Sequence, residues 1–104
     1  MSVMIVGADH LGNIEKNLRE YGIEEIEHMH GRNVGDRKKV HIPQAISLIV
    51  VLTDYVNHGT ARNVKEQAKV QGVPMIFAKR SWCSLEQQLL KSGIMAQVVS
   101  RHIQ

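Results

Sequence analysis

The chain has 104 residues, of which 43% are apolar and 22% are charged, and its formal net charge is +3. This length and composition exclude an intrinsically disordered chain and leave room for one domain, which we expect to span residues 1–104. The single cysteine, Cys83, cannot form an internal disulfide, and no apolar run approaches the roughly 20 residues of a membrane helix, so we expect a cytoplasmic protein with no membrane partner.

The first third of the chain alternates short apolar runs with polar turns. Residues 3–6 are apolar without interruption, which predicts a buried strand, and residues 7–10 form the turn after it. Apolar residues then recur at intervals of three and four over residues 11–21, just before Gly22, so we predict an amphipathic helix with a glycine C-cap. Residues 23–29 mix apolar and acidic residues and predict a second strand near an edge of the sheet.

The middle of the chain contains the most strongly apolar stretch. A loop rich in glycine and positive charge precedes it, and residues 36–41 predict a short helix inside that loop. Residues 47–52 are dominated by leucine, isoleucine and valine without alternation, which predicts a strand buried on both faces. A helix follows, with Asn57 or Thr60 as its N-cap, and it ends at Gly72.

The last third of the chain repeats the same alternation. Residues 73–78 predict a fourth strand, and Ser84 with Gln87 predicts a capping box at the start of the next helix, which ends at Gly93. The apolar residues of this helix are Leu85, Leu89 and Leu90. The tail, residues 94–104, fits a helix, a further strand or an oligomer contact, and its pattern does not separate these.

Strands that alternate with helices indicate an α/β fold with right-handed parallel crossovers. We therefore predict a single-domain, doubly wound parallel sheet of the Rossmann-like or flavodoxin-like kind, with helices on both faces. The predicted strand order is 2-1-3-4, with four strands, or five if the tail adds one. In this order the winding reverses between the first and third strands, and ligands of such sheets bind at the carboxyl ends of the strands beside that reversal.

Polar side chains follow each predicted strand and would meet at one rim of the sheet. This rim combines cations, hydroxyl groups and helix starts, which suit an anionic ligand such as a phosphate or a carboxylate. We expect Asp54 to orient a ribose hydroxyl or a base edge, and basic residues of the rim to hold phosphate. The candidate ligand-binding residues are Asp9, His10, Arg32, Thr53, Asp54, Asn57, His58, Lys79, Arg80 and Ser81.

Other chemistry is less favoured by the sequence. His28 and His30 could chelate a metal from one face of a strand, but no four-ligand spacing matches a metal signature. Cys83 lies near Arg80 at a helix start, yet no base for a nucleophilic mechanism stands out. The G-x-G-x-x-G and P-loop fingerprints are missing from the chain. We therefore predict neither a metal nor a cofactor, and no catalytic residue.

Four segments, residues 3–10, 30–32, 50–58 and 74–81, resemble a small bacterial family catalogued as domain of unknown function family 2325. The most specific part is Leu-Thr-Asp-Tyr-x-x-His at residues 52–58. This resemblance covers residues 3–90 and implies a Rossmann-like fold without an activity. A weaker similarity links the chain to response-regulator receiver domains, since acids follow the first and third strands. The fifth strand with its lysine and the second acid of the first strand are missing.

These observations predict a small-ligand-binding module, in a sensor or sequestering role, that acts as a homodimer and recognises a nucleotide or a nucleotide-derived signal. One alternative is an enzyme, either a receiver-like phosphoryl-transfer domain or a metal-dependent one, that uses Asp9 and Asp54. Another is an interaction domain whose basic loop docks an acidic partner.

Overall fold

The computed structural model describes residues 1–30 and 41–93. Strands and helices alternate along most of the described chain, as the sequence predicts, and the exception is the step from the second strand to the third, which contains residues 31–40. They are β1 (Ser2–Val6), α1 (Asn13–Glu20), β2 (Glu25–Met29), β3 (Leu48–Leu52), α2 (His58–Gln71), β4 (Met75–Ala78) and α3 (Trp82–Ser92). The predicted helix over residues 36–41, and any element in the tail 94–104, lie outside the described residues.

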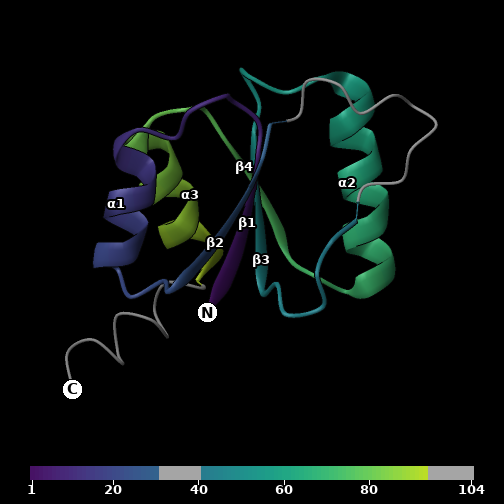
Figure 1. Ribbon diagram of the computed structural model, residues 1–104, viewed down its shortest axis with the longest axis horizontal. Coiled ribbons are helices and arrows are strands. Elements are labelled where there is room, and N and C mark those ends of the chain that lie inside the picture. The colour runs from purple at the N-terminus through teal and green to yellow at the C-terminus, as the bar shows by residue number, and fades with distance from the viewer. Residues whose placement is uncertain (31–40, 94–104) are drawn as a thin grey trace.

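The four strands form one parallel sheet in the order β2-β1-β3-β4. Helices α1 and α3 cover one face of this sheet, and α2 covers the other (Figure 1). The α/β class, the strand order and the helices on both faces are therefore confirmed. Because every strand is parallel, all four carboxyl ends meet at one rim, which is the upper edge of the sheet in Figure 1.

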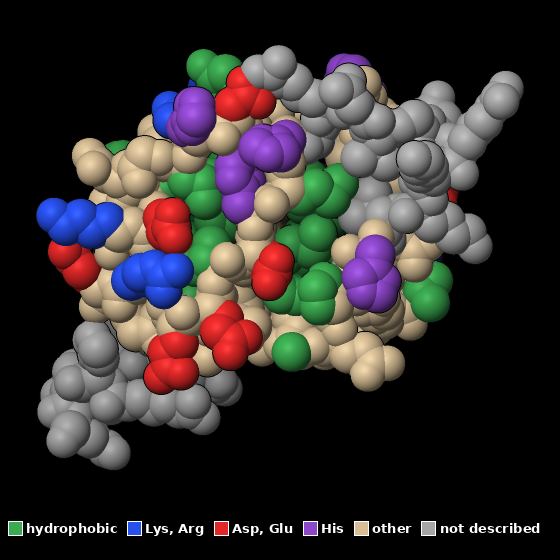
Figure 2. Space-filling view, viewed as in Figure 1, with side chains coloured by type: hydrophobic (Ala, Val, Ile, Leu, Met, Phe, Trp, Pro, Cys, Tyr) green, Lys and Arg blue, Asp and Glu red, His purple; other side chains and the backbone are tan. Residues whose placement is uncertain are grey.

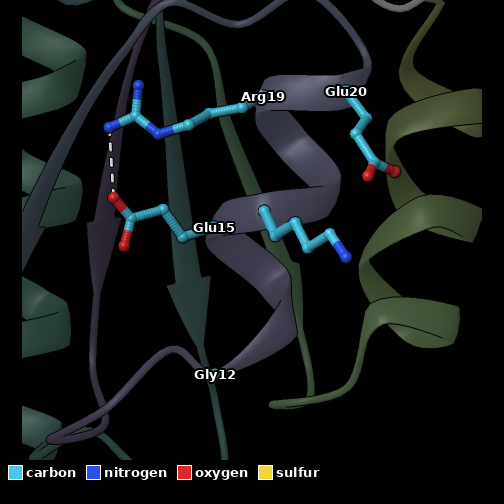
Figure 3. A pocket seen from close by; sticks show the side chains of 5 residues that line it. Gly12, Glu15, Arg19 and Glu20 are labelled. Carbon is cyan, nitrogen blue, oxygen red and sulfur yellow. Dashed lines mark hydrogen bonds and ion pairs between the residues drawn. The ribbon is translucent and has the colours of Figure 1, made fainter.

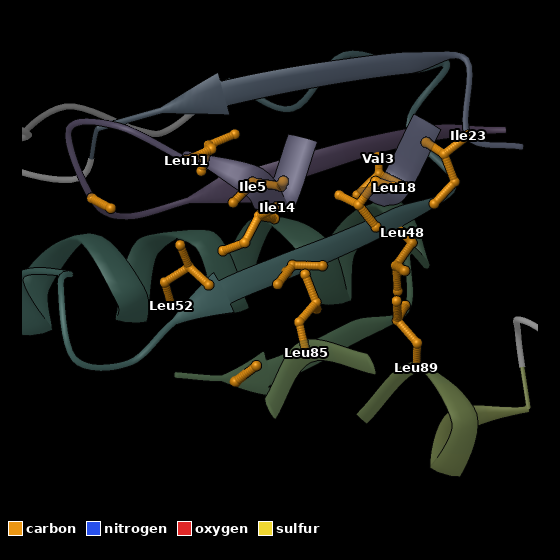
Figure 4. Packing of buried hydrophobic residues seen from close by; sticks show 13 residues of the cluster. Val3, Ile5, Leu11, Ile14, Leu18, Ile23, Leu48, Leu52, Leu85 and Leu89 are labelled. Atoms are coloured by element: carbon orange, nitrogen blue, oxygen red, sulfur yellow. The ribbon is translucent and has the colours of Figure 1, made fainter. Parts of the chain in front are cut away.

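Strand β3 is the centre of the packing, and each of its five residues is buried. Leu48, Val50 and Leu52 face the core under α1 and α3, where they meet Leu85 and Leu89 (Figure 4). Ile49 and Val51 point to the opposite side and pack in the core under α2. Each such side chain contributes about 1.5–3 kcal/mol when fully buried, so the run fixes the middle of the sheet.

The helix ends confirm some of the predicted caps and correct others. Asn57 caps α2 through its side chain, which accepts the N–H of Gly59, and Gly72 ends this helix in a left-handed conformation. The predicted capping box at Ser84 is wrong, because Ser81 is the N-cap of α3 and accepts the N–H of Ser84. Leu85 and Leu89 of this helix pack in the core, whereas Leu90 is 60% exposed.

A side-chain cluster joins α1 to α3. The rings of Tyr21 and Trp82 lie 5.3 Å apart, and the Tyr21 hydroxyl donates a short hydrogen bond to Glu86. This hydrogen bond is the main reason that the pKa of Tyr21 is raised above 10.0, with burial and the negative charge of Glu86 adding to it. Trp82 thus packs between two helices.

Among the described residues no helix is long and apolar enough to cross a membrane.

Candidate functional site

The turn after β1 has an unusual backbone that places it close to β3. Gly7 has a φ of +117°, and a Cβ atom at this residue would lie 3.1 Å from the carbonyl oxygens of Leu52 and Tyr55. Ala8 has a φ of +65°, a left-handed conformation that is uncommon for a residue with a side chain. Its N–H donates to the Tyr55 carbonyl at 3.0 Å. The rim loops after β1 and β3 are therefore joined directly, at the place where the winding of the sheet reverses.

His28 supports this turn from the neighbouring strand β2. Its Nε2 atom lies 2.9 Å from the carbonyl oxygens of both Gly7 and Ala8. Since both partners are acceptors, Nε2 carries the proton and donates to them. The His30 ring lies 5.2 Å from the His28 ring, and its Nδ1 atom is 4.0 Å from Oδ1 of Asp9. His28 is thus a structural donor within the rim and is already used by the fold.

Arg80 joins three rim loops from the turn after β4. Its backbone N–H donates to Oδ1 of Asp54 at 2.9 Å, which ties it to the loop after β3. Its side-chain Nε donates to the His10 carbonyl at 2.7 Å, which ties it to the loop after β1. The guanidinium carbon also lies 5.9 Å from the centre of the Tyr55 ring, within the range of a cation–π contact.

A pocket of about 460 Å³ opens between the ends of β1 and β3. Loops after three strands contribute its walls. The described residues that line it are Ala8, Asp9, His30, Asp54, Tyr55, Val56 and Asn57. Ligand pockets have volumes of about 300–1,000 Å³, so this one suits a small molecule. It lies at the place where a doubly wound sheet is expected to bind its ligand.

The structure brings only part of the predicted site together. Asp9, Asp54 and Asn57 line the pocket. His10 and His58 are exposed beside it, and the Thr53 hydroxyl donates to the Ala78 carbonyl. Arg32 lies outside the described residues.

The predicted basic end of the site has other contacts. The N–H of Lys79 donates to the Ser84 hydroxyl, Ser81 caps α3, and Arg80 holds the rim loops. These three residues follow β4 and do not belong to the described lining of the pocket. Of the described cations that we expected around a phosphate group, Arg80 contacts the pocket wall through the Tyr55 ring, whereas Lys79 is not part of the described lining.

Four lining residues were absent from the predicted set, namely Ala8, His30, Tyr55 and Val56. The position of each directly after a strand was a usable signal. Tyr55 is 56% exposed, so its ring is accessible at the pocket wall. Sequence reasoning favoured charged and amide groups and so passed over the aromatic ring next to Asp54.

A second hollow, of about 520 Å³, lies on the outer surface of α1 (Figure 3). Its lining comes from this one helix and from Gly12 at its start, and Arg19 pairs with Glu15 across it at 3.1 Å. Exposed pairs of this kind are solvated and contribute little. The hollow is larger than the rim pocket, but its described lining belongs to one helix and the residue before it, whereas three loops line the rim pocket, so we regard the rim pocket as the candidate site.

Titratable groups are distributed unevenly over the surface that Figure 2 shows. Histidine side chains gather toward the upper, rim end of this view beside an acidic side chain, whereas the lysine and arginine side chains lie mainly at the left. No group of three or more His, Cys, Asp or Glu side chains within residues 1–30 and 41–93 is arranged to hold a metal ion. Of the rim histidines, His28 has hydrogen-bond partners in the described structure, the carbonyl oxygens of Gly7 and Ala8.

Comparison with known proteins identifies a family to which the chain belongs. Residues 2–92 match a family model described as "Uncharacterized protein conserved in bacteria (DUF2325)". No curated protein and no solved structure matches the chain. The match covers the whole sheet, its three helices and the rim pocket.

Proposed function

Because the chain belongs to DUF2325, a bacterial family whose description assigns no activity, we propose from the rim geometry that it is a small-ligand-binding module. Its ligand is a nucleotide or a nucleotide-derived signal, held in the rim pocket, and its role is that of a sensor or a sequestering protein. The observation that carries this proposal is the pocket of about 460 Å³ at the reversal of winding between β1 and β3.

Three features support a ligand site over an ordinary loop surface. The pocket is built from loops that are cross-linked by Arg80 and by the contact between Ala8 and Tyr55, so its walls have a defined geometry. The left-handed Ala8 at its floor is a conformation that clusters at functional sites. Carboxylate, amide, imidazole and phenol groups converge on a cavity of nucleotide size.

Each lining residue has a role in this proposal. Asp54 accepts a hydrogen bond from a ribose hydroxyl or a base edge, Asn57 hydrogen-bonds the ligand, and Tyr55 stacks on its ring. Arg80 and Ser81 shape the rim, because the N–H and Nε groups of Arg80 hold the loops after β3 and β1, and the Ser81 hydroxyl caps α3. His58, at the start of α2, and Lys79, in the turn after β4, are exposed and can approach a part of the ligand that projects from the pocket.

A thermal-shift and calorimetry panel tests this proposal. The panel contains nucleosides, linear nucleotides and cyclic mono- and dinucleotides, and we expect at least one member to raise the melting temperature and to release or absorb heat on binding. Tyr55→Ala should weaken that response, whereas Leu90→Ala should not, since Leu90 has a similar exposure but lies near the far end of α3. A panel without any response would overturn the proposal.

A phosphoryl-transfer enzyme is the second candidate, and one observation favours it: Asp9 and Asp54 line the same pocket. However, Oδ1 of Asp54 already accepts the Arg80 N–H, which occupies one of the two oxygens of the expected phosphoacceptor. Incubation with acetyl phosphate and Mg²⁺ separates the two candidates. Labelling that disappears in Asp54→Asn would favour the enzyme, and no labelling would argue against it.

Two further expectations stay predictions. The basic loop that would dock an acidic partner lies within residues 31–40, outside the described part of the chain. Binding of a polyanion such as heparin that weakens steeply with added salt would support that role. A cytoplasmic location remains a prediction from cysteine usage, and imaging of a fluorescent fusion in a bacterial cell would test it.

A further inference from the structure

Helix α2 carries a line of positive side chains on its outer side. We propose that this line binds the sugar–phosphate backbone of a single-stranded nucleic acid. Its members, which we call the α2 stripe, are Arg62, Lys65 and Lys69, with His58 at the end nearest the rim. This surface lies outside the described lining of the rim pocket, and its partner belongs to another class of molecule than the small ligand of the proposed function.

The spacing of the stripe residues places them on one face of the helix. They follow one another at intervals of four, three and four residues, and side chains three or four residues apart are neighbours on a helix. At a rise of about 1.5 Å per residue, Arg62 and Lys69 lie about 10 Å apart along the axis. The buried residues of α2 are Thr60, Val64 and Ala68, so the stripe faces away from the sheet that this helix covers (Figure 1).

The cations of the stripe have no counter-ion within the protein. Arg62, Lys65 and Lys69 are exposed, and none of them forms a hydrogen bond or an ion pair within residues 1–30 and 41–93. The arginine of α1 differs, because it pairs with a carboxylate one turn away. Glu66 is the one carboxylate of α2, so three permanent positive charges stand against one negative charge. Such an excess on one surface attracts a polyanion.

The composition of the stripe favours a nucleic acid over an acidic protein. Its members are long or polar side chains, and none of them is apolar. Protein interfaces bury an apolar core that supplies most of the binding energy, and the stripe has no residue for such a core. Phosphates repeat at regular intervals along a nucleic acid and are contacted by lysine and arginine without an apolar anchor.

The stripe begins beside an accessible aromatic ring. His58 directly follows Asn57, which caps α2 and lines the rim pocket, and Tyr55 of the same pocket wall is 56% exposed. Proteins bind single strands by combining cations along the backbone with rings on which bases stack. A strand that lies on the stripe can therefore place a base against Tyr55. This last contact rests on the proposed function, whereas the stripe does not.

The salt dependence of binding tests the stripe. Fluorescence anisotropy of a labelled 12-nucleotide oligothymidylate measures its affinity for the 104-residue chain. For single strands the logarithm of the binding constant falls with the logarithm of the salt concentration, with a slope of about −0.7 per contacted phosphate. Three cations predict a slope of about −2, which is a loss of about 20-fold between 50 and 200 mM salt. Poly-L-glutamate of equal charge should compete at least fivefold more weakly than unlabelled oligothymidylate.

Two double variants that change the net charge equally separate the stripe from the charge of the whole protein. Lys65→Gln with Lys69→Gln leaves one stripe cation, so the affinity at 50 mM salt should fall by about tenfold or more and the slope should shrink to about −0.7. Lys16→Gln with Lys91→Gln removes two exposed lysines from α1 and α3, on the opposite face of the sheet, and should change the affinity less than twofold. Glutamine suits helices, so both proteins should fold.

Tyr55→Ala tests the contact at the rim end. We expect at least fivefold weaker binding of the oligothymidylate with an unchanged slope, because the variant removes a ring and no charge. If Tyr55→Ala has no effect and the nucleotide panel gives no response, the proposed function and the stacking contact fall while the stripe stands.

Other results would overturn the stripe itself. These are no binding of the oligothymidylate at 50 mM salt, equal losses of affinity in the two double variants, or competition by poly-L-glutamate as strong as that by the oligonucleotide. Each of them would leave the rim pocket and its small ligand unaffected, since the nucleotide panel tests these separately.

Discussion

The backbone N–H of Arg80 donates to Oδ1 of Asp54 at 2.9 Å, which joins the loop after β4 to the loop after β3. Because the acceptor is a side chain and the donor is backbone, its contribution can be measured at Asp54 alone. We expect Asp54→Ala to lower the free energy of unfolding by about 1 kcal/mol, while Asp54→Asn stays close to the wild type. Urea denaturation, followed by the fluorescence of the single tryptophan, Trp82, measures the free energy of unfolding of both variants. Equal losses in the two variants would contradict this account.

Removal of the Arg80 side chain should loosen the loop after β1 without unfolding the sheet. We expect Arg80→Ala to lose about 1 kcal/mol and to shift the NMR amide signals of residues 8–10, since Nε no longer holds the His10 carbonyl. Arg80→Lys should behave in the same way, because an ammonium group lacks the planar geometry of the guanidinium. Arg62→Ala, at an exposed position of α2, is the control and should leave those signals in place.

Gly7→Ala should be much more damaging than Gly72→Ala, although both glycines have positive φ angles. At Gly7 the new Cβ would lie 3.1 Å from two carbonyl oxygens, whereas at Gly72 it would meet nothing within 4 Å. Gly72→Ala therefore costs about 1–2 kcal/mol from backbone strain alone. Gly7→Ala adds a steric penalty and should cost about 2–4 kcal/mol in all. Chemical denaturation measures the loss in the free energy of unfolding of each variant. Similar losses would show that the backbone at the end of β3 shifts at little cost.

The raised pKa of Tyr21 makes stability fall at alkaline pH. The unfolded chain releases this proton near its ordinary pKa of about 10, while the folded protein retains it to higher pH. The folded state then binds more protons, so the free energy of unfolding decreases as the pH rises from about 10 through the folded pKa. Tyr21→Phe should flatten this decrease and cost about 1 kcal/mol at neutral pH, where the hydrogen bond to Glu86 is lost.

The homodimer stays a prediction, and β4 is where we expect it to form. This edge strand is Met-Ile-Phe-Ala and carries no charge, whereas the opposite edge, β2, carries Glu25 and Glu27. Charged residues on an edge strand prevent pairing with another chain. Analytical ultracentrifugation should show a dimer for the wild type and for Val70→Lys, and a monomer for Phe77→Lys, where a 44% exposed ring is replaced. A monomeric wild type would contradict this prediction.

The fold followed from the sequence because its strongest signals are local. The apolar run of β3 has no alternative to a strand buried on both faces, and the glycines that end α2 and α3 mark their last turns. The start of α3 was misjudged, since Ser81 and Ser84 both suit a cap. Tertiary packing decided between them: a helix that begins at Trp82 brings its ring against Tyr21.

The candidate site was predicted in its place but only partly in its composition. Strand order located the rim and brought Asp9, Asp54 and Asn57 to one pocket. The sequence could not show that Arg80 is occupied by the His10 carbonyl, because that contact spans 70 residues and depends on how two loops approach each other. Basic residues near a strand end suggested a phosphate site, whereas one of them, Arg80, holds the rim loops after β1 and β3 together.

The central place of β1 has a consequence for synthesis on the ribosome. This strand is made first, yet it pairs on one side with β2 and on the other with β3, whose last residue is Leu52. Until Leu52 has left the exit tunnel, one edge of β1 has no strand to pair with its backbone N–H and C=O groups. Contacts of such long sequence separation slow folding, so this interval is when the protein is most exposed to aggregation and most in need of a chaperone.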